Sequence, residues 1–213
     1  MTSLLDQFLV VVLLLNLLNL GTSRIGAVIR TVAIQGVLIG LMPLLVHGGR
    51  TPLALLIAAA PVALKGFVIP AMLFRAMRDA EIRREVEPLV GIIPSLILGA
   101  LGTGLAVAFS ERLPLLPEHA DTLLVPASLA TVFTGFLMLT TRLKAISQVL
   151  GYLTLENGIF VFGLLLVEAM PMLLEFGVLL DLFVCIFVMG IILNHIRREF
   201  SSLSTERLSA LKE

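Results

Sequence analysis

Cysteine, histidine and charged residues are scarce in this chain, and each scarcity removes a class of function. The single cysteine, Cys185, excludes an intrachain disulfide and any iron–sulfur cluster held by several thiolates. The three histidines, His47, His119 and His195, stand far apart and show no spacing typical of metal or haem ligands. There is also no glycine-rich phosphate loop, no nucleophile–base pair and no basic tract suited to a nucleic-acid backbone. We therefore expect no catalytic centre, no cofactor, no metal site and no nucleic-acid partner.

The shortage of charge points to a solvent other than water. Charged residues make up 14% of the chain, against about 25% in an ordinary soluble domain, while 58% of the residues are apolar. The mean hydropathy is +1.07. A single domain of 213 residues cannot hide this much apolar surface from water. We predict an all-α integral membrane protein, because the apolar runs are too long and continuous for barrel strands.

Seven runs are long enough to span a bilayer, which takes about 20 mostly apolar residues per helix. The first run has no basic segment before it and no small-residue cleavage site, so we interpret it as a retained helix rather than a signal peptide. The predicted spans are Leu4–Leu20, Ile25–Val46, Pro52–Leu73, Pro88–Phe109, Thr122–Thr140, Ile146–Val167 and Pro171–Leu193.

The distribution of basic residues predicts the orientation. Positive charge accumulates on the cytoplasmic side during insertion. With the N-terminus outside and the C-terminus inside, twelve of the fifteen lysines and arginines fall on the inside, two fall outside, and Lys65 lies within a span. The inside residues are Arg24, Arg30, Arg75, Arg78, Arg83, Arg84, Arg142, Lys144, Arg197, Arg198, Arg207 and Lys212, and the outside ones are Arg50 and Arg112.

Three ionisable side chains fall near the middle of predicted spans. Counting about 1.5 Å per residue puts Glu156 roughly 15 Å into the sixth span, with Asp181 at a similar depth in the seventh. Lys65 lies near the middle of the third span. Each costs roughly 2.5–3.5 kcal/mol to insert if charged. Glu175, one turn into the seventh span, adds a shallower carboxylate.

Ionisable groups inside a membrane mark ion or proton pathways by default, so we predict that these four groups form a lateral proton relay. Burial in lipid favours a neutral carboxylic acid, whereas a nearby ammonium favours the carboxylate. A movable lysine partner could therefore switch a carboxylate between holding and releasing a proton. In the alternative, purely structural interpretation, the charges pair to hold helices together. The polar side chains available to fill gaps in a relay are Asn157, Gln148, Thr154, Gln35, Asn16 and Asn19.

The run from Thr141 to Gly163, TRLKAISQVLGYLTLENGIFVFG, resembles the membrane protein known as component E of hydrogenase-4-type complexes. These are group 4 membrane-bound nickel–iron hydrogenases, such as formate hydrogenlyase. The resemblance includes the LENGIF motif and the later LLEFGVLLDLFV. The last three spans are also similar to the three-helix K subunit of complex I and to the C subunit of multisubunit cation/proton antiporters. This resemblance divides the chain into a four-helix membrane region at 1–121, a K-subunit-like region at 122–195 and a cytoplasmic tail at 196–213.

The K-subunit pattern assigns positions to the buried acids. Leu153 stands where complex I has a glutamate, and Glu156 lies one turn along the same face. The second complex I glutamate falls near Asp181, with Glu175 as the alternative. The residues that match the isoleucine, glycine and asparagine of the pattern are Ile146, Gly151 and Asn157.

The resemblance implies a subunit without a redox centre of its own in the cytoplasmic membrane of a bacterium. It would contact lipid, pack between antiporter-like and other membrane subunits, and meet peripheral hydrogenase and iron–sulfur subunits indirectly. Such a complex couples electron transfer in a peripheral arm to proton or sodium movement. Two alternatives stay open: a subunit of a cation/proton antiporter without a hydrogenase, and a self-standing secondary transporter. A weak match between residues 23–28 and 141–146 favours the transporter, because transporters often contain repeats.

Overall fold

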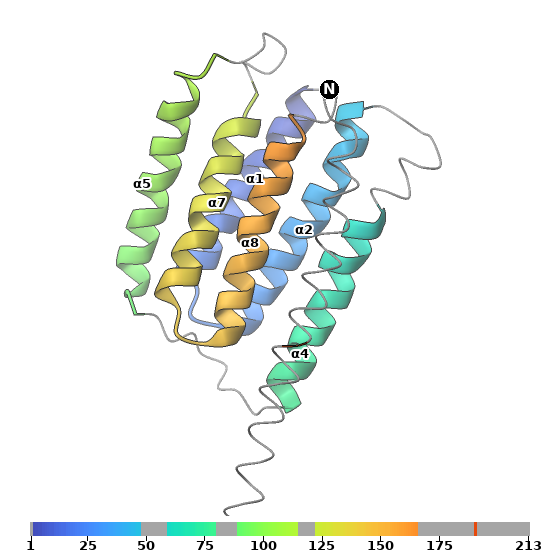
Figure 1. Cartoon of the computed structure of the whole chain (residues 1–213), viewed down its shortest axis with the longest axis vertical. Helices are drawn as coiled ribbons and strands as arrows, with labels where there is room; N and C mark the ends of the chain where they lie inside the picture. The colour runs from blue at the N-terminus through green and yellow to red at the C-terminus, as the bar shows by residue number, and fades with distance from the viewer. Residues whose placement is uncertain (1, 48–58, 80–88, 115–121, 166–189, 191–213) are drawn as a thin grey trace, which may run out of the picture.

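The computed structural model describes residues 2–47, 59–79, 89–114, 122–165 and 190, and every regular element in these ranges is helical (Figure 1). Six helices in this part are long and apolar enough to cross a membrane, as expected for a multi-pass membrane protein. The elements are α1 (Thr2–Gly21), α2 (Ile25–His47), η1 (Leu64–Val68), α4 (Ile69–Asp79), α5 (Ile92–Ser110), α7 (Leu124–Thr141) and α8 (Ala145–Gly163). Elements η1 and α4 lie in one of the six apolar helices, Ala59–Arg78.

Six of the seven predicted spans correspond to these helices, with three boundary corrections. The sixth span is predicted to end at Val167, but α8 ends at Gly163. Hydropathy predicts that the third span ends at Leu73, but α4 continues to Asp79. It predicts that the fourth begins at Pro88, but α5 begins at Ile92 after Gly91, whose extended ψ of 161° is not helical. The first turn of α5 then contains a proline, whose missing N–H costs no hydrogen bond there. The seventh predicted span, Pro171–Leu193, and the tail lie outside the described residues except for Gly190.

Two helical hairpins form the centre of the bundle (Figure 1). The α1–α2 hairpin packs beside the α7–α8 hairpin, with α1 against α7 and α2 against α8. Helix α5 lies on the outside against α7 and α1, while η1 and α4 pack against α2. Residues from both sides of position 121 therefore share one core.

That core consists of two apolar clusters with polar side chains between them. One cluster surrounds Leu20, Val32 and Leu153, and the other surrounds Val12 and Val161. In each of the four central helices a buried polar residue lies between the residues of the two clusters. These residues are Asn16 in α1, Gln35 in α2, Thr131 in α7 and Asn157 in α8.

Helices α7 and α8 approach each other through glycines. A Cβ atom on Gly158 would lie 2.6 Å from the backbone nitrogen of Val132 and 2.9 Å from the carbonyl oxygen of Ser128. A Cβ on Gly151 would lie 2.9 Å from the backbone nitrogen of Leu139. Lipid tails are as apolar as leucine, so helices in a membrane associate by such close packing rather than by the hydrophobic effect.

The ends of α1 and α7 are joined by two charged side chains. The Asp6 carboxylate of α1 accepts a hydrogen bond from the backbone N–H of Leu123, the residue that precedes α7, at 3.1 Å. At the other end, Nη2 of Arg142 donates to the carbonyl oxygen of Leu20 in the last turn of α1, also at 3.1 Å. Each charge complements the dipole of the helix end it contacts. Together they stabilise two helices that run in the same direction.

Arg142 differs from the inside residues with which the sequence groups it. It is 2% exposed, so it is buried just beyond the last turn of α7 rather than solvated. Burial lowers the pKa of its guanidinium below the ordinary value, because desolvation penalises the charged form. Its carbonyl oxygen accepts a hydrogen bond from Nε2 of Gln148, which ties the α7–α8 turn together.

Candidate functional site

Lys65 lies in a distorted turn of its helix. In η1 the backbone N–H of Ile69 donates to the carbonyl oxygen of Leu64, five residues back instead of four. Pro70 follows, and a proline has no N–H to donate and its ring clashes with the carbonyl four residues earlier. The wider turn accommodates that clash. Such turns are frequent at functional sites in proteins.

A close approach of α2 positions the lysine. A Cβ atom on Gly36 would lie 2.6 Å from Cβ of Lys65. One on Gly66 would lie 2.5 Å from Cγ2 of Val37. Glycine at these two positions lets η1 approach α2 this closely, and from there the Lys65 side chain reaches α8.

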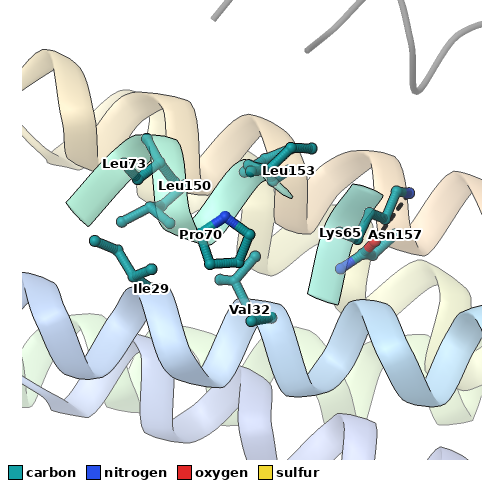
Figure 2. Close-up of a pocket in the computed structure, with 10 residues that line it drawn as sticks. Ile29, Val32, Lys65, Pro70, Leu73, Leu150, Leu153 and Asn157 are labelled. Carbon is teal, nitrogen blue, oxygen red and sulfur yellow. Dashed lines mark hydrogen bonds between the residues drawn. The ribbon is translucent and has the colours of Figure 1, made fainter. Parts of the chain in front are cut away.

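One turn of α8 receives the lysine ammonium. Nζ of Lys65 donates to Oδ1 of Asn157 at 3.1 Å (Figure 2). The same Nζ lies 3.5 Å from Oε1 of Glu156. It also lies 5.5 Å from the ring centroid of Phe160, a distance typical of a cation–π contact. The LENGIF motif thus supplies a carboxylate, an amide oxygen and an aromatic face to one cation. We call Lys65, Glu156, Asn157 and Phe160 the lysine site.

The two charged side chains of the lysine site are buried in the bundle. Lys65 is 6% exposed and Glu156 is 4% exposed. At a separation of about 4 Å, opposite unit charges attract several times more strongly near protein than in bulk water. Removing two charges from water also carries a large free-energy penalty. Removing only one partner of a buried pair is strongly destabilising, because it leaves the other charge buried without compensation.

Neutral amides extend from the lysine site across the bundle. Nδ2 of Asn157 donates to Oε1 of Gln35 at 3.3 Å, and Nε2 of Gln35 donates to Oδ1 of Asn16 at 2.8 Å. Nδ2 of Asn16 then donates to the hydroxyl of Thr131 at 2.8 Å, and that hydroxyl donates to the carbonyl of Ala127 at 2.6 Å. Every donor points away from Lys65, so this amide chain holds the oxygen of Asn157 toward the ammonium.

The amide chain orients the site but does not titrate near neutral pH. Proton exchange at this depth, among the described residues, therefore rests on Lys65 and Glu156. A second polar contact lies nearer the α1–α2 turn, where the hydroxyl of Thr31 donates to the side-chain oxygen of Asn19.

Replacing Gln35 with leucine is expected to lower the stability of the bundle by about 2 kcal/mol, because Asn16 and Asn157 would each lose a buried hydrogen-bond partner. Unfolding in mixed detergent micelles measures the change. Thr103→Val is the control, since the Thr103 hydroxyl bonds the carbonyl of Gly99 on its own helix. Equal losses in the two variants would contradict a stabilising amide chain.

The structure brings together some of the predicted residues and separates others. Lys65, Glu156, Asn157 and Gln35 meet in and beside the lysine site. Thr154 is fully buried, but its hydroxyl donates to the carbonyl of Leu150 on its own helix, and Gln148 lies at the α7–α8 turn. Asp181 and Glu175 lie outside the described residues.

Phe160 and Thr131 contribute to the site and the amide chain but do not stand out in the sequence. Phe160 follows Glu156 by four residues, a spacing that places both on one helical face. Thr131 is the type of small polar residue that hydrogen-bonds between membrane helices. Both signals are weak, because phenylalanine and threonine are ordinary members of apolar spans. Among the described residues no three histidine, cysteine or acidic side chains gather as a metal site would require.

Comparison with known proteins finds a relative along nearly the whole chain. Over 190 residues the chain is 35% identical to the protein Rv0085 of Mycobacterium tuberculosis, which carries the name of an uncharacterized protein. The match covers 88% of this chain and 86% of that protein. No protein-family profile and no solved structure matches the chain. The likeness is therefore one of whole chains rather than of a single segment.

Proposed function

We propose that this chain, which belongs to the same family as the mycobacterial protein Rv0085, is a non-catalytic membrane subunit of an energy-converting, hydrogenase-type complex. In this proposal Lys65 and Glu156 form part of a lateral proton path that is coupled to redox chemistry in other subunits. The observation that carries the proposal is the ion pair of Lys65 and Glu156, buried within two helices long and apolar enough to cross a membrane.

The lysine site has the properties that proton transfer requires. The two titratable groups are 3.5 Å apart, so a small movement of the flexible lysine brings them within hydrogen-bond distance. Proton transfer from the ammonium to the carboxylate converts a charged pair into a neutral amine and a neutral acid. Burial separates that exchange from the bulk solvent, so that protons do not leak to it. Asn157 and Phe160 stabilise the charged lysine, and the amide chain holds Asn157 in place.

The remaining parts of the proposal come from the sequence. The type of complex and the location in the bacterial cytoplasmic membrane are inferred from the resemblance of the LENGIF region to hydrogenase-4 component E. The distribution of basic residues supplies seven spans with the N-terminus outside and the C-terminus inside. Asp181 and Glu175 on the seventh span would continue the path toward a neighbouring antiporter-like subunit.

Purification of the tagged chain in a mild detergent tests the assembly. We expect antiporter-like membrane subunits and a nickel–iron large subunit to purify with it, identified by mass spectrometry. The same chain purified after a harsh detergent wash is the control for non-specific association. Recovery of a monomer alone would contradict the subunit proposal. Recovery with antiporter subunits but no hydrogenase would contradict the hydrogenase-type complex and would indicate a subunit of a cation/proton antiporter.

A further inference from the structure

A cavity opens beside the lysine site, between α2, α4 and α8 (Figure 2). Lys65 and Asn157 form one end of it, and Ile29, Leu73 and Leu150 form the other. Along α8 the distance from Leu150 to Asn157 is about 10 Å, at 1.5 Å per residue. The cavity thus runs from the lysine site toward the end of the bundle at which α2 and α8 begin.

The cavity as a whole has room for about one water molecule, and only its polar end offers that molecule hydrogen-bond partners. The volume open to the centre of a water molecule is about 10 Å³. A buried water needs roughly 10–15 Å³ by this measure and two to four polar partners. The side chains of Lys65 and Asn157 can supply those partners. Toward Ile29 the walls are apolar, and apolar cavities of this kind stay dry.

We infer that this cavity is a gated proton entrance to Lys65, with a water molecule at its polar end and a dry apolar neck toward the inner end. The inference rests on the proposed proton path and adds its access route. Hydrophobic constrictions in channels gate by wetting and dewetting. A neck of Val32, Ala33 and Leu153 that wets only transiently would keep Lys65 insulated between transfers.

The proton step balances with the groups present. The ammonium of Lys65 gives a proton to the carboxylate of Glu156, so an N–H bond breaks and an O–H bond forms. The neutral amine then takes a proton from a hydronium ion in the cavity, which becomes water. The net change is one proton moved from the cavity to Glu156, with Lys65 restored to its charged form.

The same cavity is unsuited to a sodium ion. Its space holds about one water molecule, so a hydrated metal cation does not fit. Its two polar lining residues supply one amide oxygen between them, whereas a sodium site in a membrane protein is built from several oxygens such as backbone carbonyls. The ion admitted at this site is therefore the proton.

Hydrogen exchange at an introduced thiol tests the water content. In a chain whose native Cys185 is replaced by alanine, we expect the thiol of Leu153→Cys to exchange its hydrogen with deuterated water at least tenfold faster than that of Ile97→Cys, as followed by the S–H stretch in the infrared. Leu153 is 3% exposed and lines the cavity, whereas Ile97 is 55% exposed on the apolar face of α5. Adding Ala33→Leu, which fills the cavity, should abolish the difference. Equal rates for the two cysteines would overturn the inference. A Leu153→Cys rate that does not change when Ala33→Leu is added would overturn it as well.

Proton translocation in inverted membrane vesicles gives the second readout. Ala33→Leu is expected to reduce it at least tenfold, and Ala71→Leu, on the exposed face of α4, is the matched control. Full translocation in Ala33→Leu, with translocation lost in Glu156→Gln, would overturn the entrance and keep the proton path. Full translocation in both variants would overturn the proposed function itself.

Discussion

Replacing Glu156 with glutamine is expected to reduce proton translocation at least tenfold while the chain still inserts and assembles. Glutamine has nearly the shape of glutamate and still offers an oxygen to Lys65, but it cannot take up a proton. Translocation is measured as acidification of inverted vesicles, and assembly as the set of chains that purify with the variant. Glu111→Gln, at an exposed position just after α5, is the matched control and should behave as the wild type.

Substitutions of Lys65, alone and together with Glu156, distinguish a role of the ion pair in proton transport from a role in stability. Breaking a buried ion pair by removing one partner typically costs 3–5 kcal/mol, whereas replacing both by apolar groups is often neutral. Lys65→Met alone should therefore destabilise the bundle, and the double variant Lys65→Met/Glu156→Leu should recover most of that stability. Neither variant should move protons. If the double variant pumps normally, the pair serves only to hold η1 against α8.

Replacing Gly158 with alanine is expected to lower stability by about 3 kcal/mol or more, the upper end of what overpacking costs. The new Cβ would meet backbone atoms of Val132 and Ser128 at 2.6 and 2.9 Å, so no side chain can move aside and α7 must shift. Detergent unfolding measures the loss. Because Gly158 directly follows Glu156 and Asn157, proton translocation should fall with it.

Gly104→Ala provides the control for the glycine prediction. A Cβ on Gly104 meets nothing within 4 Å, and alanine is favoured over glycine in a helix by about 1 kcal/mol. That variant should be as stable as the wild type or slightly more stable. Similar losses of stability for Gly104→Ala and Gly158→Ala would mean that Gly158 is not required for the close contact between α7 and α8.

Much of the fold follows from sequence because run length and solvent leave few choices. A run of about 20 apolar residues in lipid must be a helix. The boundary errors arise where local chemistry competes with hydropathy. Gly91 delays the start of α5, and the amphipathic end of α4 extends beyond Leu73 because its polar residues face outward.

The candidate site is foreseeable as residues but not as contacts. Lys65, Glu156 and Gln35 stand out because each is polar within an apolar run. Their partners cannot be predicted, because the order of helices around a bundle leaves no trace in hydrophobic periodicity. The burial of Arg142 escapes prediction for the same reason, since its environment is made by α1, more than a hundred residues away. The roles of Asp181 and Glu175 stay predictions.

The wide turn at Leu64–Val68 has a consequence for insertions and deletions in this segment. Each residue advances an α-helix by about 100°. Because the wide turn already holds one residue more than an ordinary turn, removing one would let an ordinary helix form with little rotation of the helix beyond it. Ile69, Leu73 and Ala76, which are buried against the bundle, would then stay on the same face. Adding a further residue would instead rotate that face by about 100° relative to the helix before it. The segment should therefore tolerate a deletion better than an insertion.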